Sequence, residues 1–174
     1  MIPLKEGGLT GDAGGVGPEA LDTLIAQQRF FKGLNPQHLK LLADSALEME
    51  FAPGHVIFEE GSPANRFYLI LEGQVVIESE KKDHNRIPVQ TLGPGDDLGW
   101  SWLFPPYSLH FSARAVTGVR TLFFYGERLR EQCEGDHEFG YQLMKRIAEV
   151  ATLSLQVTQQ RLMQYIDTNT IPES

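Results

Sequence analysis

Short β-type segments dominate the middle of this sequence and limit the folds it can adopt. Eight runs rich in Val, Ile, Phe and Thr are separated by clusters of Gly, Pro and Asn, at intervals of about 8 to 12 residues. The runs are Met49 to Ala52, His55 to Glu59, Arg66 to Glu72, Gln74 to Glu80, Ile87 to Leu92, Asp97 to Gly99, Phe111 to Ala115 and Arg120 to Tyr125. Since an open sheet would leave exposed edges, the pattern predicts a closed eight-stranded antiparallel barrel or jelly roll.

Helical segments flank this region on both sides. Residues 1–18 hold six glycines and two prolines, so we expect a flexible arm there. Short helices are predicted from Glu19 and from Asn35-Pro36, where Asn can cap and Pro suits the first turn. A sustained helical period predicts one long helix over 138–166, projecting past the roll, with 167–174 as a tail. The predicted class is α+β, mainly β, with the roll and its flanking helices spanning 19–137.

The predicted long helix carries two apolar stripes. One consists of Leu143, Ile147, Val150, Ser154 and Val157, and the other of Ala148, Ala151, Leu155, Thr158, Leu162 and Tyr165. A helix with two stripes usually faces its own domain and a second copy of itself. The second stripe therefore predicts a homodimer interface, and the alternative is one wide stripe covered within a single chain.

Composition excludes several classes of function. The 174 residues include 15 Lys and Arg against 23 Asp and Glu, a net charge of −8 that disfavours direct binding to nucleic acid. No apolar run approaches the roughly 18 to 20 residues of a membrane span, and the first residues do not form a secretion signal. We therefore expect a cytoplasmic protein of one domain.

Catalytic and metal chemistry find no support in the sequence. The five histidines show no paired spacing of the kind that binds metal, so we expect neither a metal site nor an enzyme. The single cysteine, Cys133, cannot form an internal disulfide. Its acidic neighbour Glu134 should raise its pKa, which disfavours a reactive thiolate.

Three glycine-containing segments of the sequence, called phrases below, resemble a known family. They run from Phe51 to Gly61, from Phe67 to Val75 and from Leu92 to Gly99. In this order they resemble the cyclic-nucleotide-binding domain family, which includes the sensor halves of catabolite activator and FNR-type bacterial regulators. The resemblance covers about Phe30 to Ile166 and implies a non-enzymatic domain that senses a small molecule.

In that family a loop after the last phrase holds the cyclic phosphate. It consists of a glycine and a glutamate that open a short helix, then an arginine next to a small residue. Here Gly99 is present, but Trp100 stands at the glutamate position and Leu109 or His110 at the arginine position. Indole cannot accept a hydrogen bond, and neither Leu109 nor His110 supplies a permanent cation. The sequence therefore disfavours binding of cyclic AMP or cyclic GMP.

The resemblance nevertheless implies a ligand site at this loop. A noncanonical nucleotide or another apolar or aromatic small molecule would suit its many rings, with no certain cofactor. The predicted contacts are Gly99, Trp100, Ser101, Trp102, Leu109, His110, Phe111 and Ser112, with Ser154 and Thr158 from the long helix. In one alternative the rings fill the pocket as core and the chain is a homodimeric interaction module. In another it is a true cyclic-nucleotide-binding protein with a noncanonical site.

Three smaller features of the sequence also bear on its function. Arg114, the only arginine near the loop, suits a structural ion pair better than a phosphate contact. Ser154 and Thr158 could equally serve as small polar spacers within a dimer interface. No basic helix-turn-helix segment follows Ile166, so we expect no direct DNA binding, and signalling through the long helix or an unknown protein partner.

Overall fold

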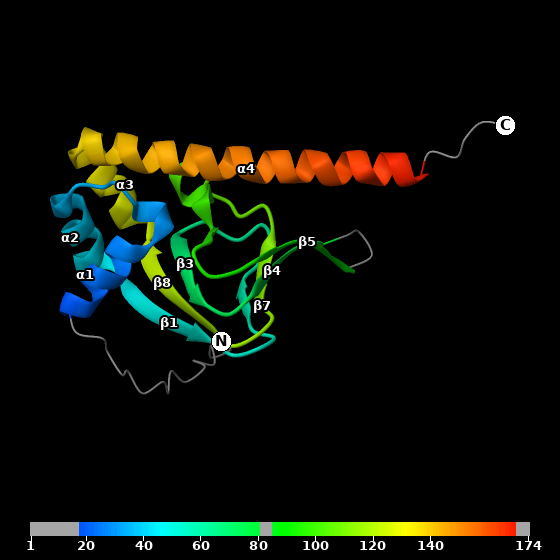
Figure 1. Ribbon diagram of the computed structural model, residues 1–174, viewed down its shortest axis with the longest axis horizontal. Coiled ribbons are helices and arrows are strands. Elements are labelled where there is room, and N and C mark those ends of the chain that lie inside the picture. The colour runs from blue at the N-terminus through cyan, green and yellow to red at the C-terminus, as the bar shows by residue number, and fades with distance from the viewer. Residues whose placement is uncertain (1–17, 81–84, 170–174) are drawn as a thin grey trace, which may run out of the picture.

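Two antiparallel sheets form the centre of the protein, and helices lie at one end and along one side (Figure 1). The computed structural model describes residues 18–80 and 85–169. The helical elements are α1 (Pro18–Gln27), η1 (Arg29–Phe31), α2 (Pro36–Ser45), η2 (Trp100–Leu103), α3 (Gly126–Gly135) and α4 (His137–Asn169). The strands are β1 (Leu47–Phe51), β2 (Val56–Phe58), β3 (Arg66–Glu72), β4 (Val75–Glu80), β5 (Arg86–Leu92), β6 (Asp97–Leu98), β7 (Ser112–Ala115) and β8 (Val119–Tyr125).

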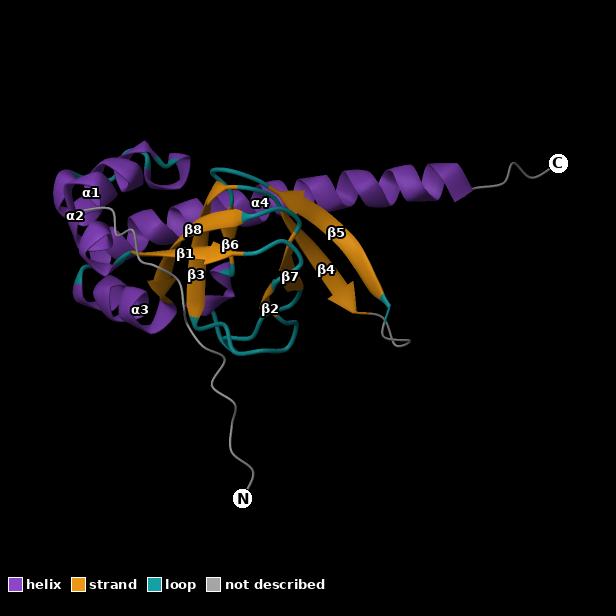
Figure 2. Ribbon diagram, turned by 90° about the horizontal axis from the view of Figure 1, so that it is seen from below, coloured by secondary structure: helices purple, strands orange, loops and turns teal. Residues whose placement is uncertain are grey.

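The strand pairing confirms the predicted eight-stranded roll. One sheet has the order β1-β8-β3-β6 and the other the order β2-β7-β4-β5, and every pairing is antiparallel (Figure 2). Strand ends differ from the predicted ones by one or two residues; β1, for example, begins at Leu47 and not at Met49. This class of fold is α+β, mainly β, as the sequence predicts.

Strand β3 is buried on both faces. Successive side chains of a strand point to opposite faces, so Phe67 and Leu69 pack in the cluster beneath the helices, whereas Tyr68 and Ile70 pack inside the roll. The two apolar clusters therefore meet at this strand. A strand with two buried faces has a nearly continuous apolar sequence, as Phe67 to Leu71 does.

The N-terminal helices form as the sequence predicts. The Asn35 side chain accepts a hydrogen bond from the His38 backbone N–H at 2.8 Å and so caps α2, with Pro36 in the first turn. The predicted arm lies outside the described residues up to position 17, and Pro18 already begins α1.

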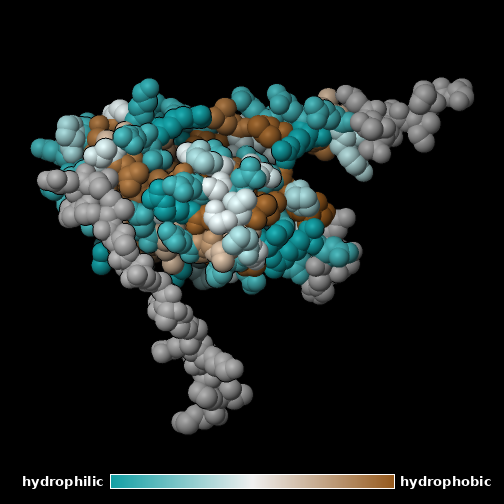
Figure 3. Space-filling model, turned by 60° about the horizontal axis from the view of Figure 1, so that its bottom comes forward, coloured by the Kyte–Doolittle hydropathy of each residue, from teal (hydrophilic) through white to brown (hydrophobic). Residues whose placement is uncertain are grey.

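Helix α4 is longer than predicted. Its 33 residues correspond to about 50 Å, and it ends at Asn169, so the first part of the predicted tail is helical and residues 170–174 lie outside the described residues. Leu143 and Ile147 are buried against the rest of the chain. Nearer its C-terminal end the helix extends past the strands, and apolar surface gathers along this edge (Figure 3). Before that end, the Arg161 guanidinium donates a hydrogen bond to the Val89 carbonyl of β5.

A single carboxylate links the start of α4 to α2. Asp136 accepts a hydrogen bond from the Phe139 backbone N–H at 3.0 Å, and its other oxygen lies 2.9 Å from Nε2 of the buried His38. These two contacts, the Phe139 N–H first, lower the pKa of Asp136. The junction between α3 and α4 is thereby fixed to the N-terminal helices.

The described residues contain no helix that is both long enough and apolar enough to cross a membrane.

Asp97 on β6 is a buried carboxyl in an apolar setting. It pairs across strands with Leu69 and is only 9% exposed. Its Oδ2 atom has no hydrogen-bond partner among the described residues. Burial, with a smaller contribution from the neighbouring Asp96, raises the pKa of Asp97 to about 7.

Replacing Asp97 with Asn should stabilise the protein most at neutral and alkaline pH. The carboxyl pKa in the unfolded chain is about 3.9, so between about pH 4 and 7 the folded state binds more protons and stability falls as pH rises. Because Asn does not titrate, the substitution removes this pH-dependent loss of unfolding free energy, which is on the order of a few kcal/mol. Thermal unfolding of both proteins at pH 4.5 and pH 8 measures the difference, and equal gains at the two values would contradict this account.

Candidate ligand site

Gly99 sets the path of the loop that the sequence singles out. It has a left-handed φ of +81° and precedes η2. A Cβ atom at this position would lie 2.8 Å from the Arg66 carbonyl oxygen, too close for any other residue. The glycine of the family motif is thus required here by both backbone conformation and space.

The loop after η2 is held from two directions. Leu109 pairs through its backbone with the β2–β3 connection: its carbonyl accepts from Gly61 N–H at 2.8 Å and its N–H donates to the Ser62 carbonyl at 2.9 Å. On the other side, the Arg130 guanidinium of α3 donates to the Trp102 carbonyl and lies 4.5 Å from the centre of the Tyr107 ring. The loop is therefore anchored both to the β2–β3 connection and to α3.

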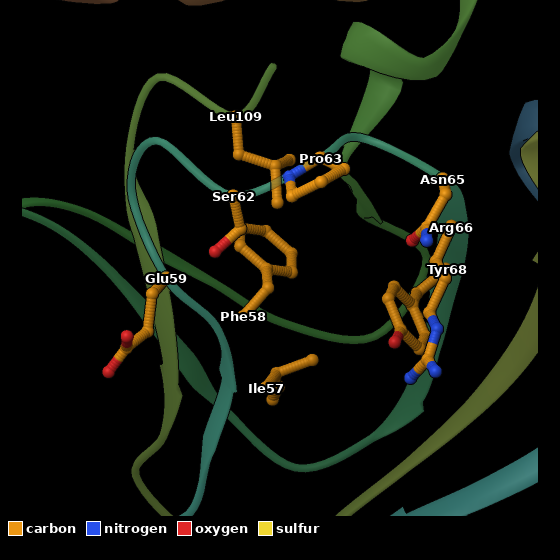
Figure 4. A pocket seen from close by; sticks show the side chains of 9 residues that line it. All are labelled: Ile57, Phe58, Glu59, Ser62, Pro63, Asn65, Arg66, Tyr68 and Leu109. Carbon is orange, nitrogen blue, oxygen red and sulfur yellow. The ribbon is translucent and has the colours of Figure 1, made fainter. Parts of the chain in front are cut away.

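A pocket of about 210 Å³ lies between this loop and the strands. Its lining residues come from β2, the β2–β3 connection, β3 and the loop, and are Ile57, Phe58, Glu59, Ser62, Pro63, Asn65, Arg66, Tyr68 and Leu109 (Figure 4). Leu109 and Pro63 lie on one side in this view, and Arg66 and Tyr68 lie together on another. Burial raises the pKa of Tyr68, and a hydrogen bond with Arg66 partly opposes that rise.

Of the ten predicted contacts, all of which lie in the described residues, Leu109 alone lines this pocket. Trp102 is fully buried in the cluster beneath the helices, 6.0 Å from the Phe67 ring, and Trp100 is half-buried against the same cluster. His110 is exposed, as is Phe111 at 42%. Ser101 is half-buried within η2.

The predicted hydroxyl contacts have other partners. Ser112 is buried and its hydroxyl accepts the Glu60 backbone N–H at 3.0 Å. On α4, the Thr158 hydroxyl donates to the Ser154 carbonyl at 2.9 Å, and neither residue lines the pocket. The residues expected from the family pattern are thus distributed over the core, the surface and α4.

The polar residues of the pocket wall, among them Arg66 and Tyr68, were not predicted from the sequence; the others are Glu59, Ser62 and Asn65. Arg66 is exposed, and its guanidinium also lies 5.6 Å from the centre of the Phe123 ring. Arg66 begins a strand directly after a turn, a position without a recognised motif. The alternation of β3 would have identified Tyr68, since it points into the roll while Phe67 does not.

Arg114 forms the structural ion pair that the sequence favours. Its guanidinium binds the carboxylate of Glu78, with Nε 3.2 Å from Oε2, and this bond raises the pKa of Arg114. The Glu78 side chain is only 5% exposed, and Arg86 lies 3.8 Å away as a second cation. Arg114 is therefore committed to a partner on the neighbouring strand β4.

Cys133 lies outside the pocket and has a weakly acidic thiol. Burial first, and then Asp136 and Glu134, raise the pKa of Cys133 to about 11, which keeps the thiol protonated. In the part of the chain that the structure describes, no group of three or more His, Cys, Asp or Glu side chains is placed to hold a metal ion.

A β-roll with a glycine-started loop beside a small pocket defines a class of ligand-binding domain. The model of the cyclic nucleotide-binding domain matches residues 48–136, just over half of the chain, and the chain belongs to this family. The family is a regulatory, nucleotide-binding one and not a family of enzymes.

A bacterial transcriptional regulator resembles the chain over much of its length. The chain is 29% identical over 128 residues to a CRP-like cAMP-activated global transcriptional regulator of Mycobacterium tuberculosis, covering 74% of this chain and 57% of that protein. It thus spans a little over half the length of this curated relative.

Solved structures give the same relationship. A Geobacter metallireducens protein described as cyclic nucleotide-binding is 35% identical with a TM-score of 0.69, covering 81% of this chain and 99% of that one. The regulatory subunit of a cAMP-independent protein kinase A from Trypanosoma brucei is 25% identical, also with a TM-score of 0.69. The match covers 83% of this chain and 51% of that one. A variant of that subunit with three substitutions, one of which introduces an arginine, is bound to cAMP in its A site.

Replacing Arg114 with Leu should destabilise the fold by roughly 3 kcal/mol, because it leaves a buried carboxylate with only the more distant Arg86. The double variant Arg114→Leu with Glu78→Gln should recover part of this loss. Urea unfolding measures both. Arg128→Leu, which removes an exposed arginine of α3, is the matched control and should have little effect. An equal effect of both single substitutions would refute the structural role of the pair.

Proposed function

We propose that this chain is a non-enzymatic sensor domain whose ligand is not anchored by a cyclic phosphate. The supporting observation is Leu109, one of the two residues at the arginine position. Its side chain is 7% exposed and its backbone groups are both bonded to the β2–β3 connection. The other, His110, is exposed.

The electrostatics of the pocket favour a ligand without a large negative charge. Arg66 and Glu59 both line it, so its charged side chains balance. A phosphate that lacks its arginine loses a charge-assisted pair worth roughly 1.5 to 3 kcal/mol, a factor of about 10 to 150 in affinity. Arg114 offers no replacement because it already pairs with Glu78. A small, largely apolar molecule with one or two polar groups suits these walls best.

The trypanosome relative supports a family fold that functions without cyclic AMP. That subunit belongs to a cAMP-independent kinase, and a variant with an introduced arginine carries cAMP in its A site. We infer that the present chain has an analogous change of ligand preference, arising from Trp100 and from Leu109 or His110.

Titration calorimetry should detect no micromolar binding of cyclic AMP or cyclic GMP by the natural chain. Leu109→Arg or His110→Arg should improve the affinity for cyclic AMP about 10- to 150-fold, because each introduces the missing cation. Testing both positions covers the two possible alignments, and exposed position 110 tolerates a longer side chain. Leu109→Met is the uncharged control. Micromolar binding by the natural chain would overturn the proposal.

A second candidate function, a homodimeric interaction module without a ligand, is favoured by the burial of Trp102. This indole fills the core, and the nearby pocket of about 210 Å³ is smaller than the roughly 300 to 1,000 Å³ of typical ligand sites. Native mass spectrometry of protein purified from its own host separates the two functions. A copurified small molecule supports the sensor, and the bare chain mass supports the interaction module.

We further propose that either function uses a homodimer formed through the second stripe of α4. Leu155 and Leu162 are each 57% exposed, and Ala148 and Thr158 are exposed beside them. Burying such leucines contributes roughly 1.5 to 3 kcal/mol each, so a second copy of the helix is a suitable partner. Movement of α4 would then carry a signal between the two copies or to a protein partner.

Leu155→Arg should convert the dimer into a folded monomer, because it places a charge in the centre of the stripe. Light scattering gives the mass and circular dichroism the fold. Gln160→Arg is the control, since this exposed residue lies on the side of α4 opposite the stripe. An unchanged mass for Leu155→Arg would show that the stripe is not the interface.

A further inference from the structure

A second hollow, of about 260 Å³, lies between η1 and α4 and is separate from the loop site. The N-terminal helices and the first half of α4 lie side by side at this end of the molecule (Figure 1). The residues around the hollow are Arg29, Phe30, Lys32, Gln142, Lys145, Arg146, Glu149, Val150 and Leu153. None of them belongs to the family motif or to the predicted site.

Positive charge is concentrated around this hollow. Arg29, Lys32, Lys145 and Arg146 contribute four cations against one carboxylate, Glu149. The whole chain has 15 cationic residues and a net charge of −8, so a local excess of positive charge is unexpected from its composition. Clustered cations repel one another and are stabilised by an anion between them.

The Arg146 guanidinium, which lines the hollow, is held in place by three hydrogen bonds. One guanidinium nitrogen donates to the Gln142 carbonyl at 2.7 Å and to its side-chain oxygen at 3.1 Å, and the other donates to the Lys32 carbonyl at 2.7 Å. Partial burial lowers the pKa of Arg146 without neutralising it. The guanidinium is thus held in place and joins α4 to the segment after η1.

The rest of the wall is apolar. Phe30 is almost fully buried beneath the hollow, Val150 is half-buried, and Leu153 is 52% exposed at its edge. A bare inorganic ion would leave this apolar surface unused, whereas an anion attached to an apolar group would cover it. At about 260 Å³ the hollow is smaller than the roughly 300 Å³ of typical ligand sites, so it suits a compact molecule of few atoms and not a peptide segment.

We propose that this hollow binds a small oxyanion attached to an apolar group, with organic phosphates as the chemical class. The anion contacts Lys32, Lys145 and Arg146, and the apolar group packs on Val150 and Leu153. Because the site bridges η1 and α4, occupancy restrains the helix that carries the proposed dimer stripe. The site does not depend on the ligand preference of the loop.

Phenyl phosphate is the test probe, followed by amide chemical shifts in NMR of the full chain. Saturable shifts are expected at Lys32 and along 142–150, and 0.5 M salt should weaken them. The double variant Lys32→Ser and Lys145→Ser removes two exposed cations and should weaken binding roughly tenfold. It leaves Arg146 and its bonds intact. Lys40→Ser removes an exposed lysine of α2 outside the hollow and should bind as the natural chain does.

Two further probes test each half of the proposed ligand. Phenol lacks the charge and inorganic phosphate lacks the apolar group, so both should bind more weakly than phenyl phosphate. Equal binding of phenol would refute the anion contact, and equal binding of inorganic phosphate would refute the apolar one. The proposal is also overturned if phenyl phosphate produces no saturable shifts, or if the double variant binds as tightly as Lys40→Ser.

Discussion

The double-sided burial of β3 is the constraint on which the rest of this structure depends. The strand lies between β8 and β6, contributes Phe67 and Leu69 to the cluster beneath the helices, and contributes Tyr68 and Ile70 to the interior of the roll. A shift of one residue in its register would exchange these two sets of side chains. The position of the helices relative to the roll is therefore fixed by one seven-residue strand, at whose start Arg66 reaches the pocket.

The sequence predicts the fold well because local signals and long-range pairing agree. Gly and Pro clusters mark the strand ends, and the cap at Asn35 and the long period of α4 mark the helices. The site is predicted less completely, since spacing does not show which way a side chain points from a short turn. Trp102 belongs to the same loop as Leu109, yet η2 directs it into the core, while Leu109 faces the pocket.

Ionic partners decide which cations remain for a ligand. Arg114 is bound by Glu78, and Arg120 is shared between Glu48 and Glu72, so these two arginines are occupied. By contrast, the cations between η1 and α4 have one carboxylate among them. In a chain of net charge −8, the local arrangement of charges is thus more informative about anion binding than their sum.

The contacts of Asp136 set the direction in which α4 leaves the rest of the domain. The helix begins directly after this contact with His38, is about 50 Å long, and is buried only along its first half. For a rod of this length, a change in direction of about 5° at the first turn would displace the far end by about 4 Å and the position of Arg161, which contacts Val89, by about 3 Å. The exposed apolar side chains lie towards this distal end, so the direction set at the first turn of α4 determines where they are presented.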